Sequence, residues 1–367
     1  MKKAKVALVH DFLYWRGGAE RCLEALRELF PGAPLFTLFW DRARLPEYRG
    51  GDVRTSFLDR LPFITRNHYH YLPLYPAAVS SLDFSGFDLI ISSSWAWSRN
   101  ITVPAGALHI CYCYTPMRFA AGFFDEYMAG KPAVTKLAFR VMVRRLTSWE
   151  KRRGSPQTRY LAISEEVKKR IARHYGSASE VVYPPVDTGF FTPLPGCRRE
   201  PFSLLVSRLV PYKRVDCAVN AFRLSERRLV IVGEGPESPM LRRNAPPNVE
   251  FAGSVSDSEL LELYRRGKAL VMPQVEDFGL AALEAQACGM PVLAYGKGGA
   301  LETVIPGITG HFFHEQTPEA LGRGLAEMEE LHFQTDALRD NALRFSRDLF
   351  LERFREKLGS SAGFTCC

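Results

Sequence analysis

ALVMPQVEDFGLAALEAQACGMPVLAY, which spans residues 269–295, carries the pattern that decides the fold. Its apolar run 269–272 predicts a strand, residues 279–288 predict a short helix with Gly289 as its C-cap, and residues 291–295 predict another strand. A strand, a helix and a second strand in this order form the unit from which parallel sheets are built. The stretch therefore predicts an α/β protein.

The same alternation extends outward from this stretch in both directions. Strands are expected at 5–10, 88–92, 108–114, 160–163, 202–207, 228–232 and 249–252, and helices at 18–30, 134–151, 165–175, 214–222, 260–266 and from 318 to about 358. A Pro-rich stretch, 183–196, separates two sets of such elements and is typical of an interdomain linker. We expect two Rossmann-like domains, 1–187 and 188–346, each a doubly wound parallel sheet, which face a cleft.

The composition is that of a globular protein with two cores. The 367 residues are 46% hydrophobic and 24% charged. No apolar run reaches the 18 residues that a membrane span needs, and the short apolar run Val6–Val9 predicts a first strand rather than a signal peptide. The protein is therefore expected in the cytoplasm. The eight cysteines show no metal-ligand spacing and no Asp-x-Asp occurs, so we expect no metal and no cofactor.

The positive charge is confined to the first half of the chain. Residues 1–187 contain 27 Lys and Arg against 17 Asp and Glu, a net charge of +10, whereas residues 188–367 contain 21 against 23, a net charge of −2. A basic half indicates an anionic partner, such as a phospholipid surface, a lipid diphosphate or nucleic acid. The alternative is that the charge serves solubility alone.

A glycine pair follows the first predicted strand. Gly17 and Gly18 lie in the loop that opens the first helix, where backbone amides and the helix N-terminus favour an anion. The loop lacks the Gly-x-Gly-x-x-Gly spacing of dinucleotide-binding proteins. The alternative is a simple tight turn.

Two cations follow the predicted strand 202–207. Arg208 and Lys213 lie at the carboxyl edge of the sheet, where a planar guanidinium and a compact ammonium suit a diphosphate. The alternative is a solvated basic turn.

Two glutamates flank the helix start in the deciding stretch. Glu276 lies in the loop after a strand, and Glu284 lies within a short helix of otherwise small and apolar residues. A carboxylate there needs hydrogen-bond donors, which the vicinal hydroxyls of a ribose supply. The amides of Phe278, Gly279 and Leu280 between them are expected to hold phosphate. For either glutamate alone, a surface salt bridge is the alternative.

These residues together resemble the retaining glycosyltransferases of family 4, which have the GT-B fold, and among them the bacterial mannosyltransferases of O-antigen and exopolysaccharide assembly. The resemblance covers nearly the whole chain. Besides Ser207-Arg208, Lys213 and the two glutamates, it rests on Gly17-Gly18-Ala-Glu-Arg, Thr115-Pro-Met-Arg118, Ala162-Ile-Ser164, Tyr183-Pro-Pro-Val-Asp187 and Gly296-Lys-Gly-Gly-Ala-Leu-Glu302.

The resemblance implies roles for individual residues. Glu284 would bind the donor ribose, Glu276 the donor sugar, and Arg208 and Lys213 would neutralise the diphosphate. The Gly17-Gly18 loop would approach the donor. The amides of Phe278, Gly279 and Leu280 would contact the diphosphate and the sugar of the donor. The backbone around Gly253 and Val255 would lie beside the base. The helix 347–358 would cross back to the first domain.

The chain departs from the family pattern at two positions. Related sequences usually read Tyr-Cys-His-Thr-Pro where this chain has Tyr114, and tend to carry His where it has Trp95. Tyr114 therefore stands at a catalytic position, where it can donate a hydrogen bond but is no cation near neutral pH. The change bears on acceptor choice and rate rather than on donor binding.

The sequence thus predicts a metal-independent, retaining hexosyltransferase that uses a nucleotide sugar as substrate, GDP-mannose foremost and UDP- or other GDP-hexoses as alternatives. The expected acceptor is a polyprenol-diphosphate-linked oligosaccharide or a polysaccharide, with peripheral membrane contact through the basic half. The cations of the long helix near 134–151 and its end would serve that contact, unless the helix simply covers the core: Arg140, Arg144, Arg145, Lys151, Arg152 and Arg153.

Two other functions are compatible with the same fold. One is a non-hydrolysing nucleotide-sugar epimerase, and the other is a catalytically weak homologue that acts as a partner subunit, which Tyr114 and Trp95 suggest. A dinucleotide oxidoreductase is disfavoured, because Gly233-Glu-Gly235-Pro lacks the third glycine of the fingerprint and comes late in the chain.

Overall fold

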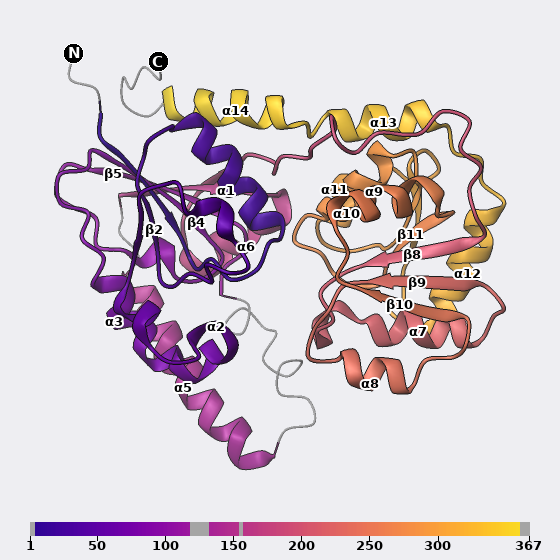
Figure 1. Cartoon of the computed structure of the whole chain (residues 1–367), viewed down its shortest axis with the longest axis horizontal. Helices are drawn as coiled ribbons and strands as arrows, with labels where there is room; N and C mark the ends of the chain where they lie inside the picture. The colour runs from indigo at the N-terminus through magenta and orange to yellow at the C-terminus, as the bar shows by residue number, and fades with distance from the viewer. Residues whose placement is uncertain (1–3, 118–131, 154–156, 360–367) are drawn as a thin grey trace. The chain divides into compact units, whose positions relative to one another are not determined.

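The computed structural model describes residues 4–117, 132–153 and 157–359. The chain divides into two compact units (Figure 1). Unit 1 comprises Met1–Pro185 and Phe350–Cys367, and unit 2 comprises Val186–Leu349. Arg118 and the terminal Cys366 and Cys367 lie outside the described residues. In the described part of the chain, no helix combines the length and the apolarity that crossing a membrane requires.

Unit 1 is built on a parallel sheet in the order β3-β2-β1-β4-β5-β6-β7. Its strands are β1 (Val6–His10), β2 (Leu35–Thr37), β3 (Val53–Thr55), β4 (Leu89–Ser94), β5 (Leu108–Cys113), β6 (Thr158–Ala162) and β7 (Ser179–Val181). Its helices are α1 (Gly18–Leu29), α2 (Ile64–Asn67), α3 (Tyr75–Ser80), α5 (Ala133–Arg153), α6 (Glu165–Tyr175) and most of α14 (Arg347–Gly359). The central strands β1, β4 and β5 are almost fully buried because helices cover both faces of the sheet (Figure 1), although they carry polar residues such as His10, Ser93 and His109.

Local sequence signals explain where several helices begin and end. Ser164 caps α6 by accepting a hydrogen bond from the Val167 amide at 3.0 Å, and Gly176 ends the helix with φ at +65°. Phe350 and Phe354 fix α14 to unit 1, since their rings lie 5.7 and 5.8 Å from that of Tyr112.

Unit 2 is built on a second parallel sheet in the order β10-β9-β8-β11-β12-β13. Its strands are β8 (Phe202–Val206), β9 (Arg228–Val232), β10 (Val249–Gly253), β11 (Ala269–Met272), β12 (Val292–Tyr295) and β13 (Gly310–Phe313). Its helices are α7 (Val215–Arg223), α8 (Ser238–Arg243), α9 (Asp257–Arg266), α10 (Leu280–Ala287), α11 (Ala300–Thr303), α12 (Pro318–Glu329) and α13 (Thr335–Leu343).

Adjacent residues of one strand serve the two opposite faces of this sheet. Leu205 packs in the cluster that α7, α8 and α12 cover, and Leu204 packs in the cluster under α9, α10 and α13 (Figure 1). A strand that is buried on both faces loses the apolar–polar alternation and reads as a continuous apolar run.

The sheets confirm the α/β expectation, and most predicted elements lie within a few residues of the observed ones. The Cys288 backbone forms the C-cap of α10, so Gly289 is the next residue, with φ at +76°. The expected elements omitted β2, β3, β7 and β13, which have only three or four residues each.

Each sheet has one point at which the strand order reverses. In unit 1 the reversal lies between β1 and β4, and in unit 2 it lies between β8 and β11. The loops that leave two such strands diverge to opposite faces of the sheet, which opens a crevice at the carboxyl ends where ligands bind. These two points locate the candidate sites.

Candidate active site

A lysine and a glutamate meet at the reversal point of unit 2. Lys213 ends the short 3₁₀ helix Pro211–Lys213 that follows β8, and Glu276 lies in the loop that follows β11. Lys213 Nζ lies 2.5 Å from Glu276 Oε1, and each side chain is 14% exposed. The structure therefore brings together two residues that the sequence places 63 positions apart.

A glutamine completes this arrangement. Gln274 Nε2 donates to the same Glu276 Oε1 at 2.6 Å, and the Gln274 side chain is 3% exposed with its own Oε1 buried and without a hydrogen-bond partner. The second oxygen of Glu276, Oε2, accepts no hydrogen bond from the described residues. Glu276 thus keeps one carboxylate oxygen for a ligand hydroxyl while the other is held by two donors.

The loop that carries Glu276 is fixed by backbone contacts. The Gly299 amide donates to the Glu276 carbonyl at 2.8 Å. A Cβ at Gly298 would lie 2.5 Å from that carbonyl oxygen, and a Cβ at Gly299 would lie 2.4 Å from Phe278 Cα. The glycine pair of the Gly296–Glu302 motif is therefore required by close packing against the 276–278 loop.

A second glutamine ties the two loops from the other side. Gln316 Nε2 donates to the Pro273 carbonyl at 2.7 Å, and Gln316 Oε1 accepts from Arg214 at 3.1 Å. These contacts link the segment after β8 to the segment after β11. They therefore help to hold the backbones that carry Lys213 and Glu276 in a fixed relative position.

Glu284 lies on the helix that begins directly after this loop. Its side chain is 6% exposed, and the buried Tyr264 hydroxyl donates to Glu284 Oε2 at 3.0 Å. Gly279 precedes the helix with φ at +105°, a conformation that favours glycine. The two glutamates therefore belong to one β11–loop–α10 unit, as the spacing in the sequence predicts.

The other predicted donor residues fall into two groups. Arg208 lies in the loop after β8, and Phe278, Gly279 and Leu280 lie at the start of α10, so these share the two loops that carry Lys213 and Glu276. Gly253 ends β10 at the edge of the sheet and Val255 follows it, and no hydrogen bond or ion pair between described residues joins them to the Lys213–Glu276 pair.

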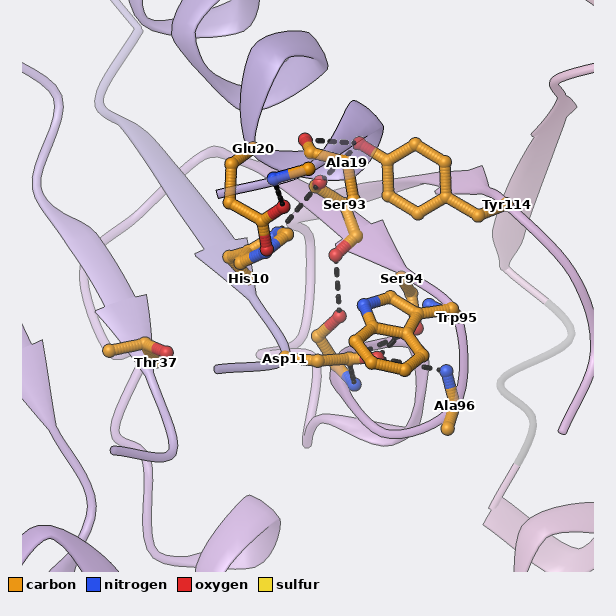
Figure 2. A network of polar contacts seen from close by, with 12 residues as sticks. His10, Asp11, Ala19, Glu20, Thr37, Ser93, Ser94, Trp95, Ala96 and Tyr114 are labelled. Carbon is orange, nitrogen blue, oxygen red and sulfur yellow. Dashed lines mark hydrogen bonds and ion pairs between the residues drawn. The ribbon is translucent and has the colours of Figure 1, made fainter. Parts of the chain in front are cut away.

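A buried polar chain occupies the reversal point of unit 1 (Figure 2). His10, at the end of β1, contacts Ser93 of β4 at 2.9 Å through Nδ1 and Glu20 of α1 at 3.3 Å through Nε2. Ser93 Oγ lies 2.8 Å from the Tyr114 hydroxyl, which donates to the Ala19 carbonyl at 3.0 Å. Because the Tyr114 proton goes to that carbonyl, Ser93 donates to Tyr114 and His10 Nδ1 donates to Ser93.

This chain changes what Tyr114 and Gly17 can do. Burial raises the pKa of Tyr114 well above its usual value, so the phenol stays neutral and its hydroxyl is committed to two partners. The Gly17 amide donates to Glu20 Oε2 at 2.8 Å, so the predicted anion-binding amide at Gly17 is already satisfied by a carboxylate. An anion at that amide would have to displace Glu20.

Asp11, which the sequence analysis did not single out, is the most heavily bonded carboxylate of this region. It accepts hydrogen bonds from the amides of residues 95–98 at 2.6 to 3.2 Å. Trp95 packs edge-on against Phe12 beside it, with ring centroids 4.8 Å apart. Trp95, at a position where related sequences tend to have His, therefore belongs to the packing around Asp11.

Among the described residues, no group of three or more His, Cys, Asp and Glu side chains is arranged to hold a metal ion. The loop between β8 and α7 carries three cations, Arg208, Lys213 and Arg214. His109 is fully buried between Ser92 and Thr158, and burial lowers its pKa to about 3, so it is neutral.

Residues 197–345 match the family described as glycosyl transferases group 1. This part of unit 2 therefore resembles group 1 glycosyltransferases. The match covers nearly all of this unit and contains every predicted donor residue except the glycine pair at 17–18.

Curated proteins that resemble part of the chain have named substrates. A GDP-mannose-dependent alpha-(1-6)-phosphatidylinositol monomannoside mannosyltransferase of Mycobacterium tuberculosis is 34% identical over 196 residues, which are 45% of this chain and 51% of the relative. A D-inositol 3-phosphate glycosyltransferase of Streptomyces bingchenggensis is 32% identical over 200 residues, 46% of this chain and 44% of the relative. The chain matches about half the length of these relatives.

Solved structures resemble the chain over nearly its whole length. Anabaena HepE, solved with UDP and glucose, has a TM-score of 0.71 at 19% identity and covers 97% of this chain and 100% of its own. Sucrose-phosphate synthase from Thermosynechococcus elongatus has a TM-score of 0.70 at 20% identity, covering 97% and 99%. The chain has the GT-B fold that the sequence predicts.

Gln274 gives a direct test of how Glu276 is held. Replacing Gln274 by Leu keeps its volume and removes the N–H donor, so Glu276 is expected to lose its fixed orientation. We expect kcat/KM to fall by roughly 10- to 100-fold, the size of a lost hydrogen bond to a charged group. Steady-state kinetics with the donor varied measure the loss.

A second variant separates positioning from simple packing. Gln274→Glu places a second carboxyl group beside that of Glu276. The two carboxyl groups can share a proton, and so form a hydrogen bond, only when the pH falls. We expect its activity to recover relative to the wild type below neutral pH, whereas Gln274→Leu stays low throughout. A Gln274→Glu profile parallel to that of the wild type would contradict the positioning role.

Proposed function

We propose that the chain is a retaining, metal-independent hexosyltransferase that takes its sugar from a nucleotide donor, GDP-mannose foremost. The observation that carries the proposal is the Lys213–Glu276 pair at the reversal point of unit 2, directly before the N-terminus of α10. A cation, a carboxylate with one open oxygen and a helix start supply the three chemistries that a nucleoside diphosphate sugar needs.

The donor is assigned to these residues by their chemistry. The Lys213 ammonium and the Arg208 guanidinium take the negative charge of the diphosphate, aided by the first amides of α10. Glu276 Oε2 accepts a hydroxyl of the sugar, and Glu284 accepts the vicinal hydroxyls of the ribose. The cations do the work of charge neutralisation on the diphosphate, and on this ground we propose that transfer needs no metal.

Transfer exchanges one bond at the sugar carbon for another. The bond from C1 to the diphosphate oxygen breaks, and a bond from C1 to the acceptor oxygen forms on the same face. The acceptor proton passes to the departing diphosphate, whose growing charge Lys213 and Arg208 stabilise. The tied hydroxyl of Tyr114 takes no part in this proton transfer. Its proposed role is to hold the first turn of α1 through the Ala19 carbonyl.

The acceptor is proposed to be a lipid-linked or polysaccharide glycan that meets the enzyme at the cytoplasmic face of a membrane. Two observations support an anionic, lipid-borne acceptor: the net charge of +10 on residues 1–187, and a relative that is named for a phosphatidylinositol mannoside. An epimerase or a weak partner subunit is the alternative, and the relatives named above favour a transferase.

One experiment tests the donor and the reaction class together. The purified chain is heated with GDP-mannose, GDP-glucose, UDP-glucose or UDP-galactose, and melting is followed with and without a polyprenol-diphosphate oligosaccharide. A donor at about 100 times its dissociation constant adds roughly 2.7 kcal/mol of stability. We expect GDP-mannose to give the largest shift, and GDP to be released only when acceptor is present. Conversion of the donor in the absence of acceptor would instead identify an epimerase.

A further inference from the structure

The N-terminal half of α5 presents apolar side chains to solvent. Val134, Leu137 and Val141 are 80%, 63% and 43% exposed. Their spacing of three and then four residues places them on one stripe of the helix. The stripe is not needed to hold α5 in place, because Val143, Leu146 and Trp149 on other faces pack or are buried against unit 1. This half of α5 extends beyond the rest of unit 1 in Figure 1.

The exposed surface of α5 carries positive charge and no negative charge. Glu150 is the helix's only acidic residue, and it is fully buried with the Tyr175 hydroxyl at 2.7 Å and His174 at 3.3 Å. Arg144 and Arg145 are exposed and form no ion pair with the described residues. The cations of the helix are Lys136, Arg140, Arg144, Arg145, Lys151, Arg152 and Arg153.

This combination fits one partner better than others. A nucleic acid or an acidic protein would use the cations and leave Val134, Leu137 and Val141 in water. An apolar protein surface would leave Arg144 and Arg145 without counter-charge. An anionic bilayer satisfies both sets at once, because aliphatic side chains enter the acyl boundary while arginines stay at the phosphates.

We propose that the outer face of α5 is a docking surface for an anionic lipid bilayer. Val134, Leu137 and Val141 insert below the headgroups, and Arg144 and Arg145 contact lipid phosphates beside them. The surface lies on unit 1 and shares no residue with the donor site. It extends the proposed function by holding unit 1 at the surface where a lipid-linked acceptor is found.

The test is co-sedimentation of the full chain with vesicles. Vesicles of phosphatidylcholine alone are compared with vesicles that also contain phosphatidylglycerol, at low and at high salt. We expect binding only to the anionic vesicles and a loss of binding in high salt. Substituting Val134, Leu137 and Val141 together by Gln keeps the helix and removes the apolar insertion, so partitioning is expected to fall at least about 10-fold.

Charge reversal tests the second half of the surface. The double variant Arg144→Glu and Arg145→Glu is expected to lower partitioning on the order of 100-fold, since each basic residue near an anionic surface contributes several-fold. Leu224→Gln and Arg323→Glu are the matched controls, because both residues are exposed in unit 2, and neither change is expected to alter vesicle binding.

Three results would overturn the docking surface: equal binding to neutral vesicles, binding that survives the triple Gln variant, or binding of RNA but not of vesicles through Arg144 and Arg145. The donor-induced melting shift is measured on the same variants without vesicles. A variant that loses vesicle binding but keeps the donor-induced melting shift leaves the proposed transferase function intact. If the wild type binds vesicles but none of the donors raises its melting temperature, only the proposed function is contradicted.

Discussion

Replacing Lys213 by Met is expected to lower kcat/KM for sugar transfer by roughly 100- to 1,000-fold, the usual loss when one charge-stabilising donor is removed. Lys213 Nζ lies 2.5 Å from Glu276 Oε1 in a partly buried position, so its loss leaves a carboxylate where the diphosphate must sit. The departing diphosphate gains charge in the transition state, and Lys213 contributes most there. We therefore expect kcat to fall more than KM rises, as measured by steady-state assays of released nucleotide.

Two variants make the effect of Lys213 specific. Lys268→Met removes a lysine from the opposite end of the same strands, where Lys268 pairs with Glu329, and should leave transfer unchanged. The double variant Lys213→Met and Glu276→Gln removes the unpaired carboxylate, so it is expected to recover donor affinity but not kcat. An unaltered kcat/KM in Lys213→Met would remove the diphosphate role from this residue.

The sequence predicts the long and continuous elements of this fold well. β9 and β11 match the expected ranges because they are buried on both faces, so β11 and all of β9 after Arg228 form continuous apolar runs. α6 and α9 follow from Ser164 and from the Ser256–Glu259 capping box. β2, β3 and β7 are missed because three residues are too few to show a periodic pattern of apolar residues. These strands form because they pair with neighbouring strands of the sheet.

The sequence predicts the candidate site only in part. It places Lys213 and Glu276 after two strands, but it does not reveal that β8 and β11 are neighbours, since strand order depends on contacts distant in sequence. His10, Asp11, Glu20 and Ser93 were not predicted as one group, because they come from distant parts of the chain and only Glu20 lies in a quoted motif. One signal was available: each of His10, Asp11 and Ser93 stands at the carboxyl end of an apolar strand. Gln274 likewise follows the carboxyl end of an apolar strand, β11.

Glu284→Gln is expected to raise the donor dissociation constant by roughly 10- to 100-fold, because a neutral amide accepts ribose hydroxyls less strongly than a carboxylate does. Glutamine keeps an oxygen for the Tyr264 hydroxyl, which is fully buried and lies 3.0 Å from Glu284 Oε2. Glu284→Ala would remove that hydrogen bond, so it is expected to lower the stability of the unliganded chain as well as donor affinity.

The Tyr264→Phe variant distinguishes ribose binding from a purely structural role of Glu284. It removes the hydrogen bond to Glu284 but keeps the carboxylate, so the donor-induced melting shift should persist on a slightly less stable chain. If Glu284 served only to satisfy Tyr264, both variants would keep the donor-induced shift. Loss of the shift in Glu284→Gln alone assigns the carboxylate to the donor, because in that variant Tyr264 retains its acceptor.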